Sequence, residues 1–325
     1  MKNNEILQKQ LVGRSSALLP FLNSEGITDI LINGTQELFI ERGGILSREP
    51  NPFTQREMLH ELIERMVIPL GKRIDAAQPY LDGRLSDGSR FHVILPPIAV
   101  EGPFISIRKR RSEKPFELTE FGSERVIDIL KAEMAKGSNL LIAGGTGAGK
   151  TSLLSCLLGF VPHDHRIAVL EETMEIQVQH PHLIHLEARP PSPEGKGEVT
   201  LQVLVKNALR MRPDRLILGE CRGAEAFDMI HAMNTGHRGA LGTIHANSAL
   251  DALKRLEGLA MLAGFHVPIR TLREWIGSAI QGVVYMEKVG GLRQVIEFMG
   301  VSGLEGEVYR VTPRYKLKPL TLATS

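Results

Sequence analysis

Two kinds of hydrophobic pattern follow one another along the chain. Over residues 27–50, apolar and polar residues alternate between glycine turns, and this period of two predicts a small antiparallel sheet. Residues 54–71 place apolar side chains at the spacing of an amphipathic helix. Residues 82–110 predict further strands, separated by Asp-Gly, Pro-Pro and Gly-Pro turns. We therefore expect residues 1–115 to form an N-terminal α+β domain that includes the start of a linker.

Beyond the linker, the pattern changes to alternating helices and strands. The linker is the charged stretch from Lys109 to about Glu120, which contains Pro115. Four strands of the buried type are predicted, at residues 139–144, 166–170, 215–219 and 240–245. Helices are predicted at residues 124–137, 151–161, 200–211 and 224–236. Such an alternation indicates an α/β domain over residues 116–325, with a mostly parallel sheet that is covered by helices on both faces.

A glycine-rich segment joins the first of these strands to the helix after it. Residues 144–151 have the sequence GGTGAGKT, which matches the phosphate-binding loop pattern G-x-x-x-x-G-K-[ST]. Glycines let backbone N–H groups point at phosphate oxygens, while the Lys150 ammonium and the Thr151 hydroxyl meet the β/γ-phosphates and Mg²⁺. The N-terminus of the following helix adds partial positive charge. The predicted ATP-binding residues are Gly144, Gly145, Thr146, Gly147, Ala148, Gly149, Lys150, Thr151 and Ser152.

Carboxylates and a histidine follow three other strands. Glu220 comes directly after the strand at 215–219, where a carboxylate can orient water or help to hold Mg²⁺. A second strand is followed by the glutamates Glu171, Glu172 and Glu175. Three carboxylates so close repel one another unless a cation or an arginine shares their site. His245 ends a third strand, and although a lone histidine is usually structural, its place beside the loop favours contact with the γ-phosphate.

Arginines occur in both predicted domains. Those of the N-terminal part are Arg84, Arg90, Arg108 and Arg110, and those of the second part are Arg210 and Arg212. Phosphoryl transfer is catalysed largely by electrostatic stabilisation, and one arginine supplied by a neighbour contributes roughly 10³–10⁵ in rate. Because these arginines come from two domains, we expect a site that is shared between subunits.

Composition narrows the classes of protein. The net charge is +2, from 39 basic and 37 acidic residues, and aromatic residues make up 5% of the chain. Neither value favours a nucleic acid partner, which calls for basic surface and stacking platforms. No apolar stretch approaches the ~18 residues of a membrane span, and the first residues lack a signal-peptide core, so we expect a cytoplasmic protein. The two cysteines, Cys156 and Cys221, support neither a disulfide framework nor a zinc cluster.

Four motifs, in order, resemble those of a known family. They are DILINGTQELFIE, GGTGAGKTSLL, LEETMEI and the long segment from ARPPSPEGKGEVT to GTIHANS. Over about residues 26–310 the chain is similar to the type II/IV secretion ATPase superfamily, and most to its CpaF-like branch, the ATPases of tight-adherence (Flp) pilus assembly. The resemblance implies a homohexamer of a RecA-like P-loop NTPase domain with a smaller N-terminal domain. It also implies peripheral docking on inner-membrane platform proteins, with ATP hydrolysis moving pilins or secreted proteins.

The resemblance assigns roles to particular residues. Residues 144–151 correspond to the Walker A loop, Glu220 to an atypical Walker B element, residues 171–176 to the Asp box and His245 to the His box. The implied catalytic residues are Glu220, Glu175, Glu172, His245, Arg84, Arg90 and Arg108. The implied Mg²⁺ ligands are Thr151, Glu172 and Glu220.

Two features depart from the family pattern, and two alternatives stay open. Glu172 stands where the Asp box usually has aspartate, so its extra methylene shifts the carboxylate. The chain also begins close to the N-terminal domain, so no partner that docks through a long leading extension is carried over. One alternative is a DNA-linked motor, for instance in conjugation, which DNA-stimulated turnover would favour. The other is a scaffold that binds ATP without turnover, which negligible phosphate release would favour.

Overall fold

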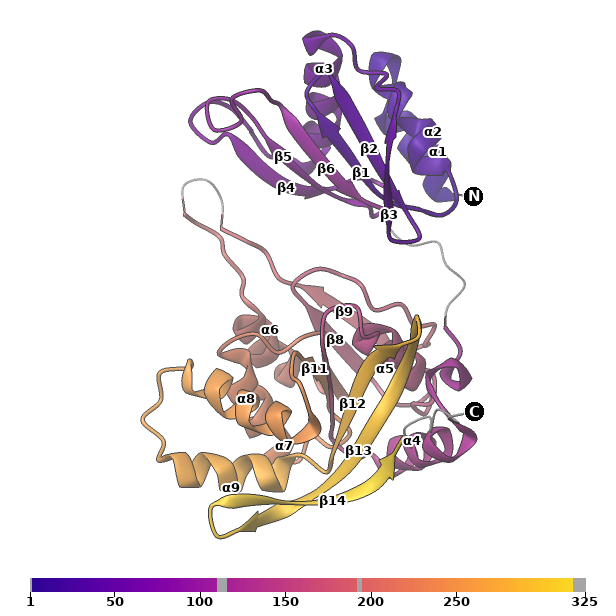
Figure 1. The fold of residues 1–325 in the computed structure, drawn as a ribbon. Helices are drawn as coiled ribbons and strands as arrows, with labels where there is room; N and C mark the ends of the chain where they lie inside the picture. The colour runs from indigo at the N-terminus through magenta and orange to yellow at the C-terminus, as the bar shows by residue number, and fades with distance from the viewer. Residues whose placement is uncertain (1, 110–115, 192–194, 318–325) are drawn as a thin grey trace, which may run out of the picture. The chain divides into compact units, whose positions relative to one another are not determined.

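The computed structural model describes residues 2–109, 116–191 and 195–317 (Figure 1). It contains two compact units, residues 1–114 and 115–325, and each is described by itself. Arg110 lies outside the described residues. Within the described ranges, no helix is both long and apolar enough to cross a membrane.

The first unit is a six-stranded antiparallel sheet with helices packed on one face. Its strands are β1 (Ile27–Asn33), β2 (Glu37–Arg42), β3 (Ile45–Glu49), β4 (Tyr80–Arg84), β5 (Arg90–Ile94) and β6 (Phe104–Arg108), in the spatial order β3-β2-β1-β6-β5-β4. Its helices are α1 (Lys2–Gln10), α2 (Leu19–Asn23) and α3 (Arg56–Val67). Alternate strand residues such as Ile30 and Ile32 share one core with Leu59 and Leu62 of α3. The predicted antiparallel sheet and the predicted helix are both confirmed.

The second unit is built on an eight-stranded sheet (Figure 1). Its strands are β7 (Leu140–Gly144), β8 (Ile167–Glu171), β9 (Leu183–Glu187), β10 (Arg215–Leu218), β11 (Leu241–Ile244), β12 (Gly282–Val289), β13 (Leu292–Glu305) and β14 (Val308–Lys316). The spatial order is β14-β13-β12-β7-β11-β10-β8-β9, parallel from β12 to β9 and antiparallel from β12 to β14. The parallel part confirms the predicted sheet, whereas β9 and the β12–β14 meander lie outside the predicted strands.

Helices cover both faces of this sheet, as predicted. The helices are α4 (Glu124–Lys136), α5 (Lys150–Leu158), α6 (Leu201–Ala208), α7 (Glu225–Asn234), α8 (Ala249–Met261) and α9 (Ile269–Ala279). Alternate residues of β7 belong to different cores: Leu141 packs with α6 to α9, and Ile142 packs with α4 and α5. Local signals set the helix ends, because Gly137 closes α4 in the left-handed region and the Thr200 hydroxyl caps α6 by accepting from the N–H of Val203.

The parallel strands bring the predicted site residues to one edge of the sheet. β7, β8, β10 and β11 run in the same direction, so their carboxyl ends lie together. The glycine loop follows β7, the glutamate cluster follows β8, Glu220 follows β10 and His245 follows β11. Ligands of open α/β sheets bind at this edge.

Candidate active site

The glycine loop has the backbone that its sequence requires. Gly147 and Gly149 have φ values of +74° and +95°, which side-chain-bearing residues rarely adopt. At Gly144, a Cβ atom would lie 2.5 Å from the carbonyl oxygen of Met286 in β12. At Gly149, a Cβ would lie 2.4 Å from Cδ of Arg293 in β13. The loop therefore depends on glycine both for its turns and for its close contact with the C-terminal meander.

Lys150 is held against this loop. Its Nζ donates to the carbonyl oxygens of Gly144 and Gly145, each at 3.0 Å, and lies 3.4 Å from Nδ1 of His245. The side chain is buried, and desolvation lowers the pKa of Lys150 below its ordinary value, against the opposing effect of Glu220. The ammonium thus lies at the N-terminus of α5. A phosphate group bound there would interact with both the Lys150 charge and the partial positive charge of the helix end.

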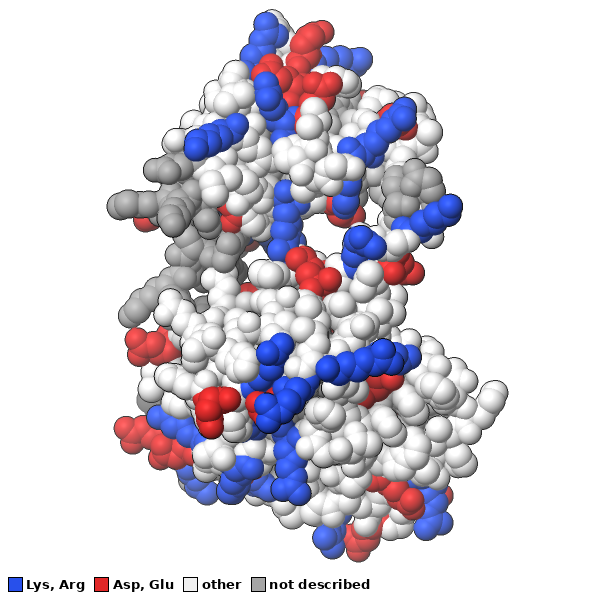
Figure 2. Space-filling model, turned by 180° about the vertical axis from the view of Figure 1, so that it is seen from behind, with Lys and Arg blue, Asp and Glu red and all other residues white. Residues whose placement is uncertain are grey.

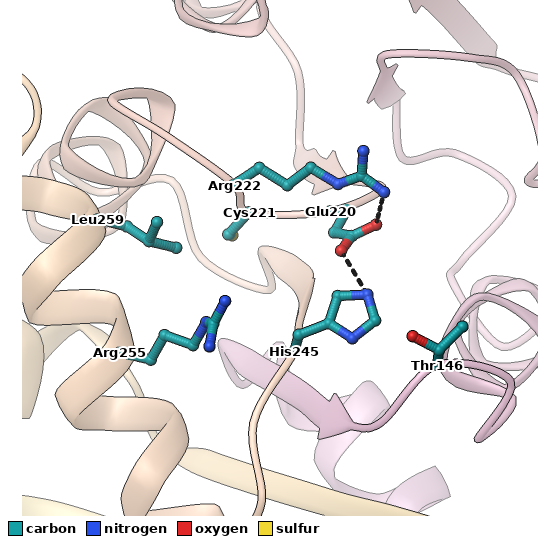
Figure 3. Close-up of a pocket in the computed structure, with 7 residues that line it drawn as sticks. All are labelled: Thr146, Glu220, Cys221, Arg222, His245, Arg255 and Leu259. Carbon is teal, nitrogen blue, oxygen red and sulfur yellow. Dashed lines mark hydrogen bonds and ion pairs between the residues drawn. The ribbon is translucent and has the colours of Figure 1, made fainter.

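Glu220 and His245 meet across neighbouring strands. Oε1 of Glu220 lies 2.9 Å from Nε2 of His245, and the two residues point toward each other in Figure 3. Burial, followed by the Lys150 charge, lowers the pKa of His245 below 6.5. A neutral imidazole with its hydrogen on Nε2 fits both contacts, because Nδ1 is then free to accept from Lys150. The Nε2 approach is close but poorly aligned: among the described residues, Oε1 of Glu220 accepts no well-formed hydrogen bond.

Arg222 ties the two acidic segments together. Its guanidinium donates to Oε2 of Glu220 at 2.8 Å and to Oε2 of Glu172 at 2.9 Å. These contacts raise the pKa of Arg222, with the Glu220 hydrogen bond as the main cause. The arginine is therefore the shared cation that clustered carboxylates need, and it brings Glu172 beside Glu220.

The glutamates after β8 do not share one environment. The Glu171 side chain is buried, and it accepts hydrogen bonds from the backbone N–H groups of Glu175 and Ile176 and from the imidazole of His185. Glu172 is half-exposed and turns toward Arg222. Ile176 is buried in the core and anchors the far end of the segment. The segment thus has one glutamate that holds its shape and one that faces the site.

A cavity of about 520 Å³ opens beside these residues (Figure 3). Its lining residues are Thr146, Glu220, Cys221, Arg222, His245, Arg255 and Leu259. Arg255 comes from α8, and within the described part of the chain it makes no ion pair. Burial raises the pKa of Cys221 well above its ordinary value, which disfavours the reactive thiolate form. Arg255, in contrast, offers the cavity a positive charge for an anionic group.

The oxygen atoms at this edge fit a Mg²⁺ ion. Mg²⁺ prefers oxygen ligands and is usually bound through one or two carboxylates together with substrate phosphates. Oε1 of Glu220 is buried and, apart from the poorly aligned approach of His245 Nε2, accepts no hydrogen bond from the described residues. The Thr151 hydroxyl lies in the first turn of α5, next to Lys150. In the described ranges, no group of three or more His, Cys, Asp or Glu residues is arranged to hold a metal.

The predicted arginines of the first unit form a row. Arg84 is paired in register with Arg90, and Arg90 with Arg108, across β4, β5 and β6. Their strand neighbours Phe91 and Ile107 point into the core, so the three arginines share the opposite face. Arg108 donates to Asp29 at 3.0 Å. Their approach to a nucleotide stays a prediction.

Arg210 and Arg212 are placed differently. They lie between α6 and β10, just before the amino end of that strand. The phosphate-binding loop follows the carboxyl end of a parallel strand in the same sheet. Both arginines therefore lie at the opposite edge of the sheet from the loop of their own chain.

Three residues near the site were not predicted from the sequence. Arg222 could have been predicted, because it lies two positions after Glu220 at the end of a strand. Arg255 had none, because it lies in an ordinary amphipathic helix. His185 was hidden in β9, whose residues are half-buried or exposed.

Comparison with known proteins identifies the family. The family model for type II/IV secretion system proteins matches residues 13–288, and the chain belongs to this family. A putative conjugal transfer protein of Mycobacterium tuberculosis is 37% identical over 96% of this chain and 91% of its own length. The conjugal transfer protein TrbB of Rhizobium radiobacter is 32% identical over 89% and 88%. The type IV secretion system protein PtlH of Bordetella pertussis is 29% identical over 89% and 94%.

Solved structures share the fold. The pilus retraction motor PilT, in a crystal structure with bound ADP, aligns with a TM-score of 0.64 at 18% identity, over 92% of this chain and 82% of the other. The ATPase DotB of Legionella pneumophila aligns with a TM-score of 0.59 at 21% identity, over 87% and 79%. At such identities the likeness establishes the architecture alone.

Proposed function

We propose that this member of the type II/IV secretion system family is a Mg²⁺-dependent ATP hydrolase. Its first unit would serve as the N-terminal domain and its second as the RecA-like ATPase domain. In this proposal it works as a homohexamer, peripherally bound at the cytoplasmic face of the inner membrane. There it powers assembly of a Tad/Flp-type pilus or protein secretion. The observation that carries the activity is the meeting of Glu220 and His245 beside the loop that holds Lys150.

The residues divide the chemistry between them. The loop amides and Lys150 bind the phosphates of ATP. The Glu220 carboxylate accepts a proton from water as the water oxygen bonds to the γ-phosphorus and the bond from phosphorus to the ADP oxygen breaks. Neutral His245 orients Glu220 and can donate to the transferred group. When bound, Mg²⁺ neutralises phosphate charge, and Thr151, Glu172 and Glu220 would hold it.

One experiment tests the activity and the assembly together. Phosphate release per protomer is measured against protein concentration, with Mg²⁺ and ATP, for wild type and for Glu220→Gln. A ring whose sites are completed by neighbours gives specific activity that rises steeply with concentration, and the Gln variant is nearly silent. Background release at every concentration, with nucleotide still bound, would favour a scaffold without turnover.

The relatives named for conjugal transfer support a second candidate, an ATPase that serves DNA transfer. Basic and acidic side chains are interspersed over the face in Figure 2, and the net charge is +2. These features favour a protein-moving motor over one that binds DNA itself. Adding single-stranded and double-stranded DNA to the phosphate-release assay separates the two, because stimulation of turnover would favour the DNA motor.

A further inference from the structure

We propose that His185 is a positioning residue, which acts through Glu171 to set the shape of the segment that carries Glu172 and Glu175. This inference rests on the proposed ATP hydrolysis. His185 lies in the edge strand β9, outside the cavity, and would contact neither nucleotide nor metal. Its effect on the reaction would be transmitted through one buried carboxylate.

Glu171 organises the acidic segment from inside. Oε1 accepts from the N–H groups of Glu175 at 3.0 Å and Ile176 at 3.1 Å, and Oε2 lies 3.3 Å from the Ile176 N–H. The carboxylate therefore ties the far end of the segment 172–176 back to Glu171. Only 4% of its side chain is exposed. A buried carboxylate in another rotamer would leave these amide groups without their acceptor.

His185 fixes the remaining freedom of that carboxylate. Its Nε2 donates to Oε2 of Glu171, the oxygen that the Ile176 N–H also approaches, and 14% of its side chain is exposed. The backbone contributes too, since the N–H of Ala188 donates to the carbonyl of Glu171 at 2.9 Å. Strand β9 and the residue that follows it therefore contact both the main chain and the side chain of Glu171.

The same carboxylate touches the Glu220 segment. A Cβ on Gly219 would lie 2.6 Å from Cγ of Glu171, so the side chain lies directly against the residue before Glu220. A change in the Glu171 rotamer would therefore disturb both carboxylates that Arg222 joins. Outer partners of metal-binding groups typically change metal affinity or activity by about 10–100-fold when removed.

The test compares a donor-deleting and a donor-conserving substitution. His185→Leu removes the donor, whereas His185→Gln can return an N–H to Oε2. The control is His182→Leu, which removes an exposed imidazole just before β9 that contacts Arg166. For each protein without nucleotide, hydrogen–deuterium exchange is measured in the peptide that spans residues 172–177, together with the melting temperature. Hydrolysis is then measured as kcat and KM.

The expected result distinguishes a positioning role of His185 from a general loss of stability. His185→Leu raises exchange at residues 172–177 and lowers kcat about tenfold, with nucleotide KM nearly unchanged because the glycine loop holds the phosphates. His185→Gln restores both values, and His182→Leu matches wild type. Unchanged exchange in His185→Leu overturns the proposal, as does raised exchange with an unchanged kcat.

A double-mutant cycle between Glu171 and His185 gives a second comparison. Glu171→Gln removes the charged acceptor, and the double variant Glu171→Gln/His185→Leu should then be no worse in kcat or exchange than Glu171→Gln alone. Additive losses would overturn the proposal. Exchange needs no turnover, so if the wild-type protein releases no phosphate, the proposed hydrolysis fails while the exchange result still shows whether His185 holds the segment.

Discussion

Nε2 of His245 lies 2.9 Å from Oε1 of Glu220, so the ends of the neighbouring strands β10 and β11 meet beside the phosphate-binding loop. His245→Ala removes this partner and the contact with Lys150. We expect kcat to fall by about 10²-fold, within the range for a positioned proton-transfer group, while nucleotide affinity changes little. Steady-state kinetics and a fluorescent-nucleotide titration measure the two effects. His231→Ala, on the exposed side of α7, is the control, and an equal loss in both variants would contradict the prediction.

The pKa of His245 should be lower in the folded protein than in the unfolded chain. Burial and Lys150 lower its pKa below 6.5 in the folded protein. The unfolded chain therefore takes up this proton at a higher pH than the folded chain, and the free energy of unfolding falls as the pH drops through this interval. We expect the imidazole of His245 to titrate below pH 6.5 by NMR in the protein without nucleotide. Melting temperatures between pH 7 and pH 5 should fall less for His245→Asn than for wild type, and a midpoint at or above 6.5 would refute the assignment.

Arg222 should matter more for activity than for stability. Its ion pairs join side chains that are 56% exposed for the arginine, 50% for Glu172 and 21% for Glu220, so the arginine end of both pairs is solvated. Exposed ion pairs contribute about 0–1 kcal/mol to stability. Arg222→Ala should therefore lower the free energy of unfolding by less than about 1 kcal/mol, but lower kcat about tenfold or more, because two carboxylates lose their shared cation.

Arg222→Lys is the informative companion. A single ammonium cannot reproduce two parallel contacts from one planar group, so we expect Lys to recover less than half of the lost activity. Denaturant unfolding and phosphate release are compared for the three proteins. Full recovery with Lys would show that charge alone is sufficient.

Gly149 should be sensitive to a single methyl group. Its φ is +95°, and an added Cβ would lie 2.4 Å from Cδ of Arg293. A left-handed conformation costs a side-chain-bearing residue roughly 1–2 kcal/mol, so Gly149→Ala should lower the melting temperature and weaken nucleotide binding. Gly258→Ala is the matched control, because Gly258 lies in α8 with nothing within 4 Å of its added Cβ. Alanine there should stabilise the helix by about 1 kcal/mol.

Much of the second unit could be predicted because local signals and burial agree there. The strands β7, β8 and β10 are fully buried, so their sequences are short apolar runs, and the glycine loop carries its own pattern. β9 gives no such run, because LIHLE is an edge strand with half-exposed side chains. β13 and β14 give no such run either, because most of their residues are half-buried or exposed.

Which residues meet at the site depends on the order of the strands in the sheet. Glu172 and Glu220 are 48 positions apart along the chain, and Arg222 reaches both because β8 and β10 are neighbours. Hydrophobic periodicity predicts strands and leaves their order open. The role of Glu171 could not be predicted either, because Glu171, Glu172 and Glu175 look alike in sequence and only burial separates them.

The arginine row of the first unit leads to a last prediction, which concerns subunits rather than single chains. Arg84, Arg90 and Arg108 are aligned across three strands, with Arg90 in the middle. If Arg90 stabilises phosphate charge in the site of a neighbouring subunit, Arg90→Ala should lower kcat by roughly 10³-fold. Arg48→Ala, which removes a surface arginine paired with Glu37 in the same sheet, should have little effect.

Mixing two inactive proteins shows whether the arginine acts between subunits. In rings that combine Arg90→Ala with Lys150→Ala, some interfaces join an intact glycine loop from one subunit to an intact Arg90 from the next. Phosphate release should then exceed the sum of the two separate preparations, and it should rise to a maximum near equal proportions. If Arg90 acted within its own chain, every site would lack one of the two cations, and mixing would give only the background of the parts.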